Sequence, residues 1–323
     1  MKIALLGLGF MGGVHARALG KHLAAVCSNV PSQLAGELTT QGNLGDPVGR
    51  LDFSGLKKYT EVAPVLADPD IDAVDICLPT NMHEAVATDA LCAGKHVLVE
   101  KPIALNGAGA ARIIAEAEAR GRILMCAQVL RFLPEYTALR EALAGLGPVR
   151  RAWFHRRCAE PAWGGWLKNP ALSGGAIFDL LIHDVDMCLH LFGAPEAIAS
   201  TGSGDSLHAQ LFYNSGMEAV VTGGWEPAAS YPFRMEYSVS AGGGTIEFSS
   251  LGRPPVLYAA EARTLPLPAC DGYAAEIAYF IECCEAGRQP ERCLPRESAR
   301  AVSLMQLLLE ARNRNGERIP CNL

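Results

Sequence analysis

The chain has 323 residues, half of them hydrophobic, which is enough to bury two separate cores and suggests two domains. Its net charge of -6 and its pI near 5.8 argue against a nucleic-acid partner, and no basic block offsets that charge.

The chain opens with an apolar run at 2–6 that is typical of a strand buried on both faces. The run leads directly into Gly-x-Gly-x-x-Gly at 7–12. In a dinucleotide-binding fold these glycines permit a tight turn, a close approach of the pyrophosphate and helix-strand packing, and the phosphates bind at the helix N-terminus. No Gly-Lys-Ser or Gly-Lys-Thr follows, which argues against a P-loop. We predict that the cofactor-binding loop consists of Gly7, Leu8, Gly9, Phe10, Met11 and Gly12.

The apolar start does not have the pattern of a secretion signal. Glycines interrupt it, no small-residue cleavage site follows, and nowhere do 18 apolar residues run together. The 11 cysteines are odd in number and scattered except for Cys283-Cys284, as expected for reduced thiols in the cytoplasm. Cys283, Cys284 and Cys293 are possible metal ligands by type, but we interpret them as buried thiols and assign no metal.

Strands and helices alternate from residue 1 to about 127, which predicts a doubly wound parallel α/β domain. The expected strands lie at 2–6, 22–27, 71–78, 95–99 and 122–127, and the expected helices at 11–20, 82–93 and 107–120. In such a fold, ligands bind at the carboxyl ends of the strands. The residues there complete the predicted cofactor site: Ser28, Asn29, Pro79, Thr80, Asn81, His83, Glu100, Lys101 and Gln128.

The end of the second strand bears on the choice of nucleotide. An acidic residue about 20 positions after the glycines commonly binds the ribose diol of NAD and repels the extra phosphate of NADP. Here Ser28 and Asn29 occupy that place and can donate to a 2'-phosphate, which favours NADP(H) over NAD(H). No arginine or lysine lies between Lys21 and Arg50, although the Gly-rich stretch 41–55 could bring Arg50, or Lys57 or Lys58 beyond it, toward the site.

The segment 96–102, His-Val-Leu-Val-Glu-Lys-Pro, places one lysine at the end of a buried strand beside a rigid proline. A surface lysine that pairs with Glu100 is the simpler interpretation of Lys101. Beside a nucleotide motif, however, we interpret Lys101 as a catalytic group.

After about residue 148 the pattern changes to short strands separated by turns, at 149–158, 196–202, 207–213, 218–225, 234–241 and 245–249. We therefore predict a Rossmann domain at 1–127 and an α+β domain at 128–323 with a large, mostly antiparallel open sheet. Helices at 271–287 and 296–314 are expected to return to the first domain, the latter by packing back on it.

An expected helix at 175–192 carries Asp179, His183 and Asp186 at i, i+4 and i+7, on one face. A histidine alone on a mostly apolar helix is commonly a satisfied core residue. One turn after Asp179, and in a chain with Lys101, His183 is better interpreted as catalytic. Asp184 is expected to be a solvated or capping charge.

The chain resembles the glucose-fructose oxidoreductase, inositol dehydrogenase and MocA (Gfo/Idh/MocA) family of NAD(P)-dependent oxidoreductases over its whole length. The marks of this resemblance are Gly7 to Gly12 with His15, the segments 79–83 and 93–102, Arg131-Phe132, and Gly174-Gly175 leading to Asp179, His183 and Asp186. The Glu-Lys-Pro strand end together with the Asp-x-x-x-His helix is the specific part. The resemblance also implies that the Lys101-Pro102 peptide bond is cis.

The resemblance implies roles that suit these side chains. His183 takes the hydroxyl proton while hydride passes to nicotinamide, and histidine titrates near ~6.5. Lys101 places positive charge beside the developing alkoxide and keeps His183 a free base, and Asp179 fixes the hydroxyl or the lysine. The same groups protonate a carbonyl that is being reduced.

The substrate is expected near basic and aromatic side chains that suit a sugar or cyclitol. The predicted contacts are Arg131, Arg156, Trp163 and Trp166, with His155, Arg157 and Lys168 nearby. The alternative for Trp163 and Trp166 is that they only pack the loop.

Three other functions stay open at this point. Transient oxidation by tightly held NAD permits epimerisation, elimination or glycoside cleavage without net redox change. A binding regulator keeps the fold and loses catalysis, and imine or biliverdin reduction differs only in substrate. Apolar residues on both alternating sets of strands 207–213, 218–225 and 234–241 indicate an oligomer, and the resemblance implies homodimers or homotetramers through this sheet.

Overall fold

The computed structural model describes residues 1–42, 45 and 48–323, and these form two compact units. The first unit comprises Met1–Val129 and Gly272–Ala299, and the second comprises Leu130–Asp271 and Arg300–Leu323. Most of the chain beyond 130 therefore has its own core, while helix α9 (Gly272–Ala286) belongs to the first unit.

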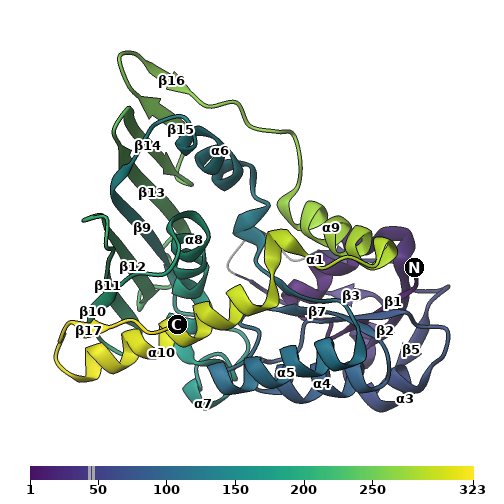
Figure 1. Ribbon diagram of the computed structural model, residues 1–323. Helices are drawn as coiled ribbons and strands as arrows, with labels where there is room; N and C mark the ends of the chain where they lie inside the picture. The colour runs from purple at the N-terminus through teal and green to yellow at the C-terminus, as the bar shows by residue number, and fades with distance from the viewer. Residues whose placement is uncertain (43–44, 46–47) are drawn as a thin grey trace. The chain divides into compact units, whose positions relative to one another are not determined.

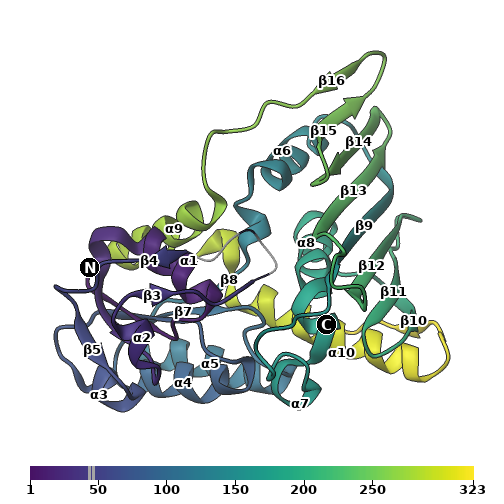
Figure 2. The same cartoon turned by 180° about the vertical axis from the view of Figure 1, so that it is seen from behind.

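The first unit is built on a six-stranded sheet in which every pairing is parallel, in the order β5-β2-β1-β6-β7-β8. This is the doubly wound order, whose direction of winding reverses between β1 and β6. Helices α1 and α9 lie on one face and α4 and α5 on the other (Figures 1 and 2). The elements are β1 (Ile3–Leu6), α1 (Phe10–Leu19), β2 (Leu23–Cys27), α2 (Pro31–Leu34), β3 (Glu37–Leu38), β4 (Gly49–Arg50), β5 (Lys57–Tyr59), α3 (Val62–Ala67), β6 (Ala73–Ile76), α4 (Thr80–Cys92), β7 (His96–Glu100), α5 (Gly107–Arg120) and β8 (Leu124–Ala127).

The second unit is built on a nine-stranded sheet in the order β16-β15-β14-β13-β9-β12-β11-β10-β17. Every pairing is antiparallel except that of β9 with β12, so the predicted α+β class is confirmed. The elements are α6 (Pro134–Leu143), β9 (Val149–Ala159), α7 (Pro170–Ser173), the π-helical η3 (Ile177–Leu181), α8 (Ile182–Phe192), β10 (Ala197–Gly202), β11 (Ser206–Phe212), β12 (Glu218–Glu226), β13 (Arg234–Ala241), β14 (Gly244–Ser249), β15 (Arg253–Tyr258), β16 (Ala262–Thr264) and β17 (Ile319–Pro320).

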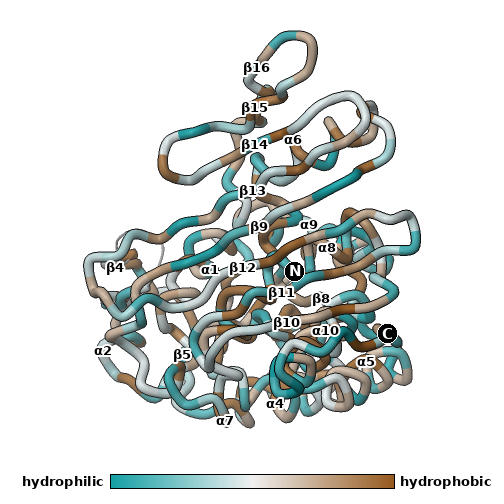
Figure 3. Tube along the Cα trace, turned by 90° about the vertical axis from the view of Figure 1, so that its left-hand side faces the viewer, coloured by the Kyte–Doolittle hydropathy of each residue, from teal (hydrophilic) through white to brown (hydrophobic). Residues whose placement is uncertain are grey.

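Alternation along the strands of this sheet defines an inner and an outer face. On β9 the inner residues Ala152, Phe154, Arg156 and Cys158 are buried, whereas the outer residue Trp153 is exposed. The inner face packs on α6 and α8, as the hydroxyl of Tyr237 shows by donating to Glu135 O (2.8 Å). Figure 3 looks onto the sheet with its mixed hydrophilic and hydrophobic residues.

The last long helix, α10 (Pro295–Asn313), departs from the prediction that it packs back on the nucleotide domain. Only its beginning, up to Ala299, belongs to the first unit. The remainder joins the second unit, where Ser200 Oγ donates to Leu308 O and Arg312 donates to Ser203 O (2.7 Å). Among the described helices, α10 included, none is long and apolar enough to cross a bilayer.

Candidate active site

The surroundings of the turn after β1 differ at each of its three glycines, Gly7, Gly9 and Gly12. Gly7 has a φ of +93°, and a Cβ there would lie 2.5 Å from Cys77 O. A Cβ on Gly12 would lie 2.0 Å from Gly7 O, so any larger residue would push helix and strand apart. Gly9 differs, because a Cβ there would meet nothing within 4 Å. The first and third glycines are therefore required by the protein itself, and the second faces open space.

The N-terminus of α1 is free to receive an anion. Gly9 is its N-cap residue and supplies no side-chain cap, and the first turn contains no acidic residue. Unpaired N-H groups and the helix dipole favour a phosphate at such a place. The open space above Gly9 and this helix end together fit the pyrophosphate of a dinucleotide.

The adenosine end of the predicted site is only partly as expected. Asn29 is exposed, but Ser28 is buried, and its hydroxyl donates to Gln33 Oε1 (2.6 Å) and accepts from Val30 N (3.1 Å). A 2'-phosphate would have to compete with Gln33 for that hydroxyl. Lys57 pairs with Asp68 and Asp70, both at 2.7 Å, near the amino ends of the strands, and so is not available to a phosphate.

Part of the Gly-rich stretch 41–55, at 43–44 and 46–47, lies outside the described residues. The described part packs on α1, where Val48 O accepts from Arg17 Nη2 (3.2 Å). Gly42 lies against the ring of Phe10, because a Cβ on Gly42 would come within 2.3 Å of that ring.

Helix α4 begins at the carboxyl end of β6 with Pro79 as its N-cap residue. Asn81 and Met82 are exposed there, whereas Thr80 is 5% exposed and His83 only 1%. Pro79 and Asn81 thus remain accessible at the predicted edge. His83 is different, because both of its ring nitrogens face backbone oxygens. Its predicted contact with the cofactor is replaced by a contact with the protein.

The carboxyl ends of β7 and β8 carry the remaining predicted residues of the first unit. Lys101 follows β7, is partly exposed, and forms a cis peptide bond with Pro102, as predicted. Gln128 follows β8 and is 1% exposed, and its Nε2 has no hydrogen-bond partner among the described residues. A buried donor without a partner is rare and suits a ligand acceptor.

Beneath the glycine turn lies a buried cluster that we did not predict. His15 Nδ1 donates to Asp75 (2.9 and 3.1 Å), and His15 Nε2 lies 3.2 Å from Glu100 Oε1. His15, Asp75 and Cys77 have the donor types of a metal site, but their donor atoms already contact one another. Burial raises the pKa of the Cys77 thiol, whereas a metal ligand is a thiolate. We therefore interpret the cluster as a charge network.

In the second unit, Asp179 lies in the π-helical turn η3 and His183 in the first turn of α8. Between Ile177 and Cys188, Asp179 and His183 are partly exposed, and all the remaining residues are buried. A single π-helical turn inside an α-helix is rare and is often found at functional sites. The predicted pair is therefore presented together at the surface of an otherwise buried segment.

Trp225, at the end of β12, contacts the candidate site but is not among the predicted site residues. Its indole Nε1 donates to Asp179 Oδ2 (3.3 Å), and the side chain is 6% exposed. It lies on the side of the sheet that faces η3 and α8. Strict alternation along β12 points to this side, because Trp225 has the same parity as the buried Ala219 and Val221 and its cross-strand partner Cys158 lies on the inner face.

The neighbours of His183 correct two further predictions. Asp184 is not solvated: it is 0% exposed and accepts two hydrogen bonds from Arg156 (2.8 and 2.9 Å). Asp186 does not share the surroundings of Asp179, because it is buried with Arg131 in a second bidentate pair (2.8 and 2.7 Å).

Arg131 and Arg156 were expected to bind substrate, but both are 3% exposed. Their guanidinium groups are held by carboxylates, and Arg156 also donates to Tyr136 Oη (3.2 Å). Burial is the largest influence on the pKa of Arg156 and lowers it, but Asp184 and Tyr136 together raise the net pKa. Both arginines therefore fix α8 from inside the fold rather than face a substrate.

The aromatic and basic residues of β9 and the following loop separate into two groups. His155 and Arg157 lie on the outer face of the sheet, where Trp153 stacks on His155 (centroids 5.3 Å apart) and Arg157 pairs with Glu226. Trp163 and Trp166 are partly exposed in the loop before α7, where Lys168 pairs with Glu160 (2.9 Å). Only this loop group stays a candidate for substrate contact.

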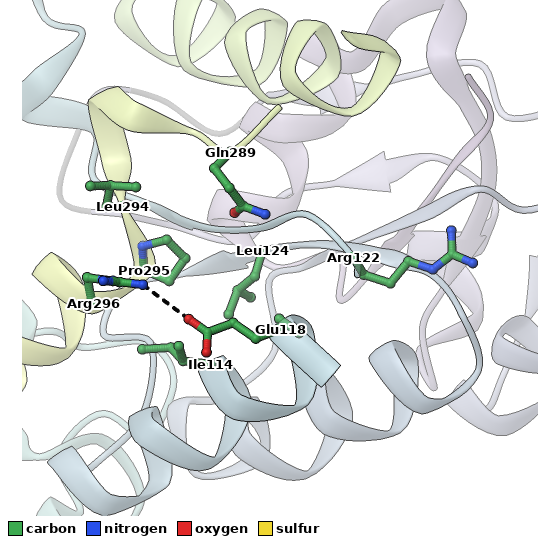
Figure 4. A pocket seen from close by; sticks show the side chains of 9 residues that line it. Ile114, Glu118, Arg122, Leu124, Gln289, Leu294, Pro295 and Arg296 are labelled. Carbon is green, nitrogen blue, oxygen red and sulfur yellow. Dashed lines mark hydrogen bonds and ion pairs between the residues drawn. The ribbon is translucent and has the colours of Figure 1, made fainter. Parts of the chain in front are cut away.

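A small pocket in the first unit is not the candidate site. It encloses ≈ 150 Å³ between α5, the start of β8 and the segment before α10, whereas ligand pockets usually enclose ~300–1,000 Å³ (Figure 4). An ion pair between Arg296 and Glu118 (3.2 Å) crosses it. It also lies at the amino end of β8, opposite to the edge that binds ligands in this fold.

Known protein families match the chain in both of its units. Residues 1–128 match a family described as oxidoreductases with an NAD-binding Rossmann fold, and residues 136–247 match the GFO/IDH/MocA C-terminal domain. UDP-N-acetylglucosamine 3-dehydrogenase of Acidithiobacillus ferrooxidans is 31% identical over 226 residues, or 68% of this chain and 65% of that protein. 1,5-Anhydro-D-fructose reductase of Ensifer adhaerens is 33% identical over 172 residues. This match covers 52% of this chain and 50% of that relative, so it spans about half of each protein.

Among solved structures, levoglucosan dehydrogenase in complex with NADH and levoglucosan aligns over 100% of both chains. The TM-score is 0.85 at 17% sequence identity, so this likeness shows the fold alone.

Proposed function

The chain belongs to the Gfo/Idh/MocA family of oxidoreductases, and from this premise we propose that it is an NAD(P)-dependent dehydrogenase or reductase. The reaction is transfer of a hydride between nicotinamide and a secondary alcohol or ketone of a sugar, cyclitol or sugar derivative. The relatives described above are named as enzymes that act on such groups, which supports the substrate class.

The observation that carries the proposal is the pair Asp179 and His183. Two polar side chains are partly exposed on a segment that is otherwise buried, and Trp225 holds one of them by a hydrogen bond. Two buried ion pairs at Asp184 and Asp186 fix the helix immediately beyond His183. A base that must meet a hydroxyl in one geometry needs this kind of support.

In the proposed mechanism, His183 accepts the hydroxyl proton as the alcohol is oxidised and returns it when a ketone is reduced. Lys101 supplies positive charge to the oxygen on which negative charge develops. Asp179, oriented by Trp225, accepts a hydrogen bond from the substrate hydroxyl or from the lysine. Lys101 belongs to the first unit, and Asp179 and His183 belong to the second.

The residues of the first unit fit a nicotinamide dinucleotide, which when bound exchanges the hydride. The turn Gly7 to Gly12 and the N-terminus of α1 would hold its pyrophosphate. Val30 (40% exposed) and Met82 (37%) offer apolar surface to the adenine at the ends of β2 and β6. Gln128 Nε2, which has no hydrogen-bond partner among the described residues, offers a donor. Trp163 and Trp166 remain our candidates for contact with the substrate.

A substrate screen tests the proposal. We expect purified protein with NAD+ or NADP+ to produce reduced cofactor from at least one cyclitol, hexose or sugar derivative, as measured at 340 nm. Conversion of a sugar without net reduced cofactor would instead indicate NAD-assisted epimerisation or elimination. Dinucleotide binding without conversion of any of these compounds would indicate a regulator and reject the proposal.

We expect NADPH to bind at least as tightly as NADH, because Ser28 and Asn29, which directly follow β2, carry no carboxylate that would repel a 2'-phosphate. Ser28→Asp should shift the preference toward NADH, and so should Asn29→Asp, whose side chain is the exposed one. Fluorescence titration with both nucleotides measures this. A wild-type preference of ~10-fold or more for NADH would contradict the reading of this strand end.

We also propose that the chain forms a homodimer or a homotetramer through the outer face of its large sheet. Trp153 is 36% exposed there, and its cross-strand neighbours are Val220 and Ser238. Light scattering at micromolar concentration should give a dimer or larger species, and Trp153→Glu should shift it toward monomer. A stable wild-type monomer would reject the proposal.

A further inference from the structure

The backbone that carries Lys101 is held at two points by buried histidines from different helices. His15 of α1 lies 3.2 Å from Glu100 Oε1, and Glu100 Oε2 accepts a hydrogen bond from Lys101 N (2.9 Å). His83 of α4 contacts Pro102 O through Nδ1 and Leu78 O through Nε2, both at 2.8 Å. The segment 100–102 is therefore connected to α1 through His15 and to α4 through His83, and His15 in turn contacts Asp75 of β6.

The first tie is an ion chain. Both ring nitrogens of His15 face carboxylates, Asp75 on one side and Glu100 on the other. Burial is the largest influence on the pKa of His15 and lowers it, but Asp75 and Cys77 together raise the net pKa well above 6.5. Burial is likewise the largest influence on the pKa of Glu100 and raises it, but His15 and Lys101 together lower the net pKa. At neutral pH, imidazolium therefore fixes the Glu100 carboxylate, which in turn fixes the Lys101 amide.

The second tie bridges two strand ends. A carbonyl oxygen only accepts, so a neutral His83 donates to one of its two carbonyl partners and a protonated ring donates to both. Burial is the largest influence on the pKa of His83 and lowers it, so the neutral ring prevails at neutral pH. In either form the ring fills the space between the turn after β6 and the turn after β7.

Neither histidine is accessible to a ligand, since His15 is 0% exposed and His83 1%. Glu100 is 8% exposed and has both oxygens engaged. We propose that His15, Glu100 and His83 are positioning residues. They hold the backbone at 100–102 in one conformation and so fix the position of the Lys101 Cα, from which its side chain extends. The proposal rests on the proposed catalytic function of Lys101.

Kinetics of three variants test the proposal. Glu100→Gln keeps the shape but removes the charge that His15 pairs with, and His83→Leu removes both contacts to the backbone. Each should lower kcat by ~10-fold or more, while Kd for NADPH and KM for the substrate change by less than ~3-fold. His83→Gln keeps one amide donor and should recover most of the kcat lost in His83→Leu. The matched control is His22→Leu, which removes a similar bond, to Met1 O (3.1 Å), at the amino end of β2.

A second measurement does not depend on activity. Competitive acetylation followed by peptide mass spectrometry reports the reactivity of each lysine. We expect the reactivity of Lys101 to change by ~3-fold or more in Glu100→Gln and His83→Leu, because its backbone is released. Lys21, which is exposed and distant in sequence, should not change.

The two measurements separate the possible failures. An inactive wild-type protein would reject the proposed function, and the acetylation result would still decide the positioning role. Unchanged Lys101 reactivity and unchanged kcat in folded Glu100→Gln and His83→Leu would overturn the inference. A loss in His83→Leu that also appears in His22→Leu would overturn it too, because it would reflect general destabilisation.

Discussion

We expect Lys101→Ala and His183→Ala each to lower turnover by ~100-fold or more, while the protein stays folded and binds dinucleotide with nearly unchanged affinity. The reason is that each removes a group that acts on the transition state rather than on the bound cofactor. Removing the base leaves the hydroxyl proton without an acceptor, and removing the lysine leaves the developing oxyanion without its positive partner. Asp179→Ala should also lower turnover, though by less.

Steady-state kinetics with the substrate from the screen, together with titration by the fluorescence of NADPH itself, separates kcat from binding. Suitable controls are Lys21→Ala and His208→Ala, which remove the same side-chain types from exposed positions in each unit. Turnover within ~3-fold of wild type in either Lys101→Ala or His183→Ala would contradict its assignment. A loss of dinucleotide binding in His183→Ala would instead point to damage of the fold.

The nucleotide unit was predicted well because its signals are local. An apolar run that leads into spaced glycines, and an apolar run that ends in Glu-Lys-Pro, are each read within a dozen residues, and α5 was predicted with its observed bounds. The strand that was missed, β5, consists of Lys57, Lys58 and Tyr59 at the edge of the sheet. An edge strand with two exposed lysines has no apolar run, so periodicity alone does not reveal it.

The second unit shows other limits of sequence reasoning. Strand β15 was missed because Pro254 and Pro255 argue against a strand, but its pairing with β14 is irregular at that place, where lost donors are tolerated. Helix α6 was missed although Pro134 stands at its start, as prolines often do. The π-turn η3 has no known sequence signature, so the helical spacing of Asp179, His183 and Asp186 suggested one shared face.

The charges around the site were predicted least well, because charge state and burial depend on partners far away in the sequence. Asp184 looks like a solvated acid until Arg156, 28 residues earlier, is brought to it. In the same way His15 meets Asp75 across 60 residues. Residue types and spacing predict the segment that carries the proposed site, whereas the division between exposed groups and groups that hold the fold required the structure.

Arg156→Met should destabilise the second unit by about 3–5 kcal/mol, because it leaves the fully buried carboxylate of Asp184 without its partner. It also removes the hydrogen bond to Tyr136 Oη. All four tryptophans, Trp153, Trp163, Trp166 and Trp225, lie in this unit, so tryptophan fluorescence during urea unfolding reports on it selectively. We expect the midpoint to fall clearly below that of the wild type.

The double variant Arg156→Met with Asp184→Leu distinguishes the cost of an unpaired charge from the loss of packing. Replacing both members of a buried pair by apolar groups of similar size is often nearly neutral, so most of the lost stability should return. Arg314→Met, which breaks an exposed pair with Glu310 on α10, should leave the midpoint almost unchanged. A double variant as unstable as Arg156→Met alone would show that the arginine contributes through its packing against Tyr136 and Met235, and the role of Asp184 in fixing the helix that carries His183 would have to be abandoned.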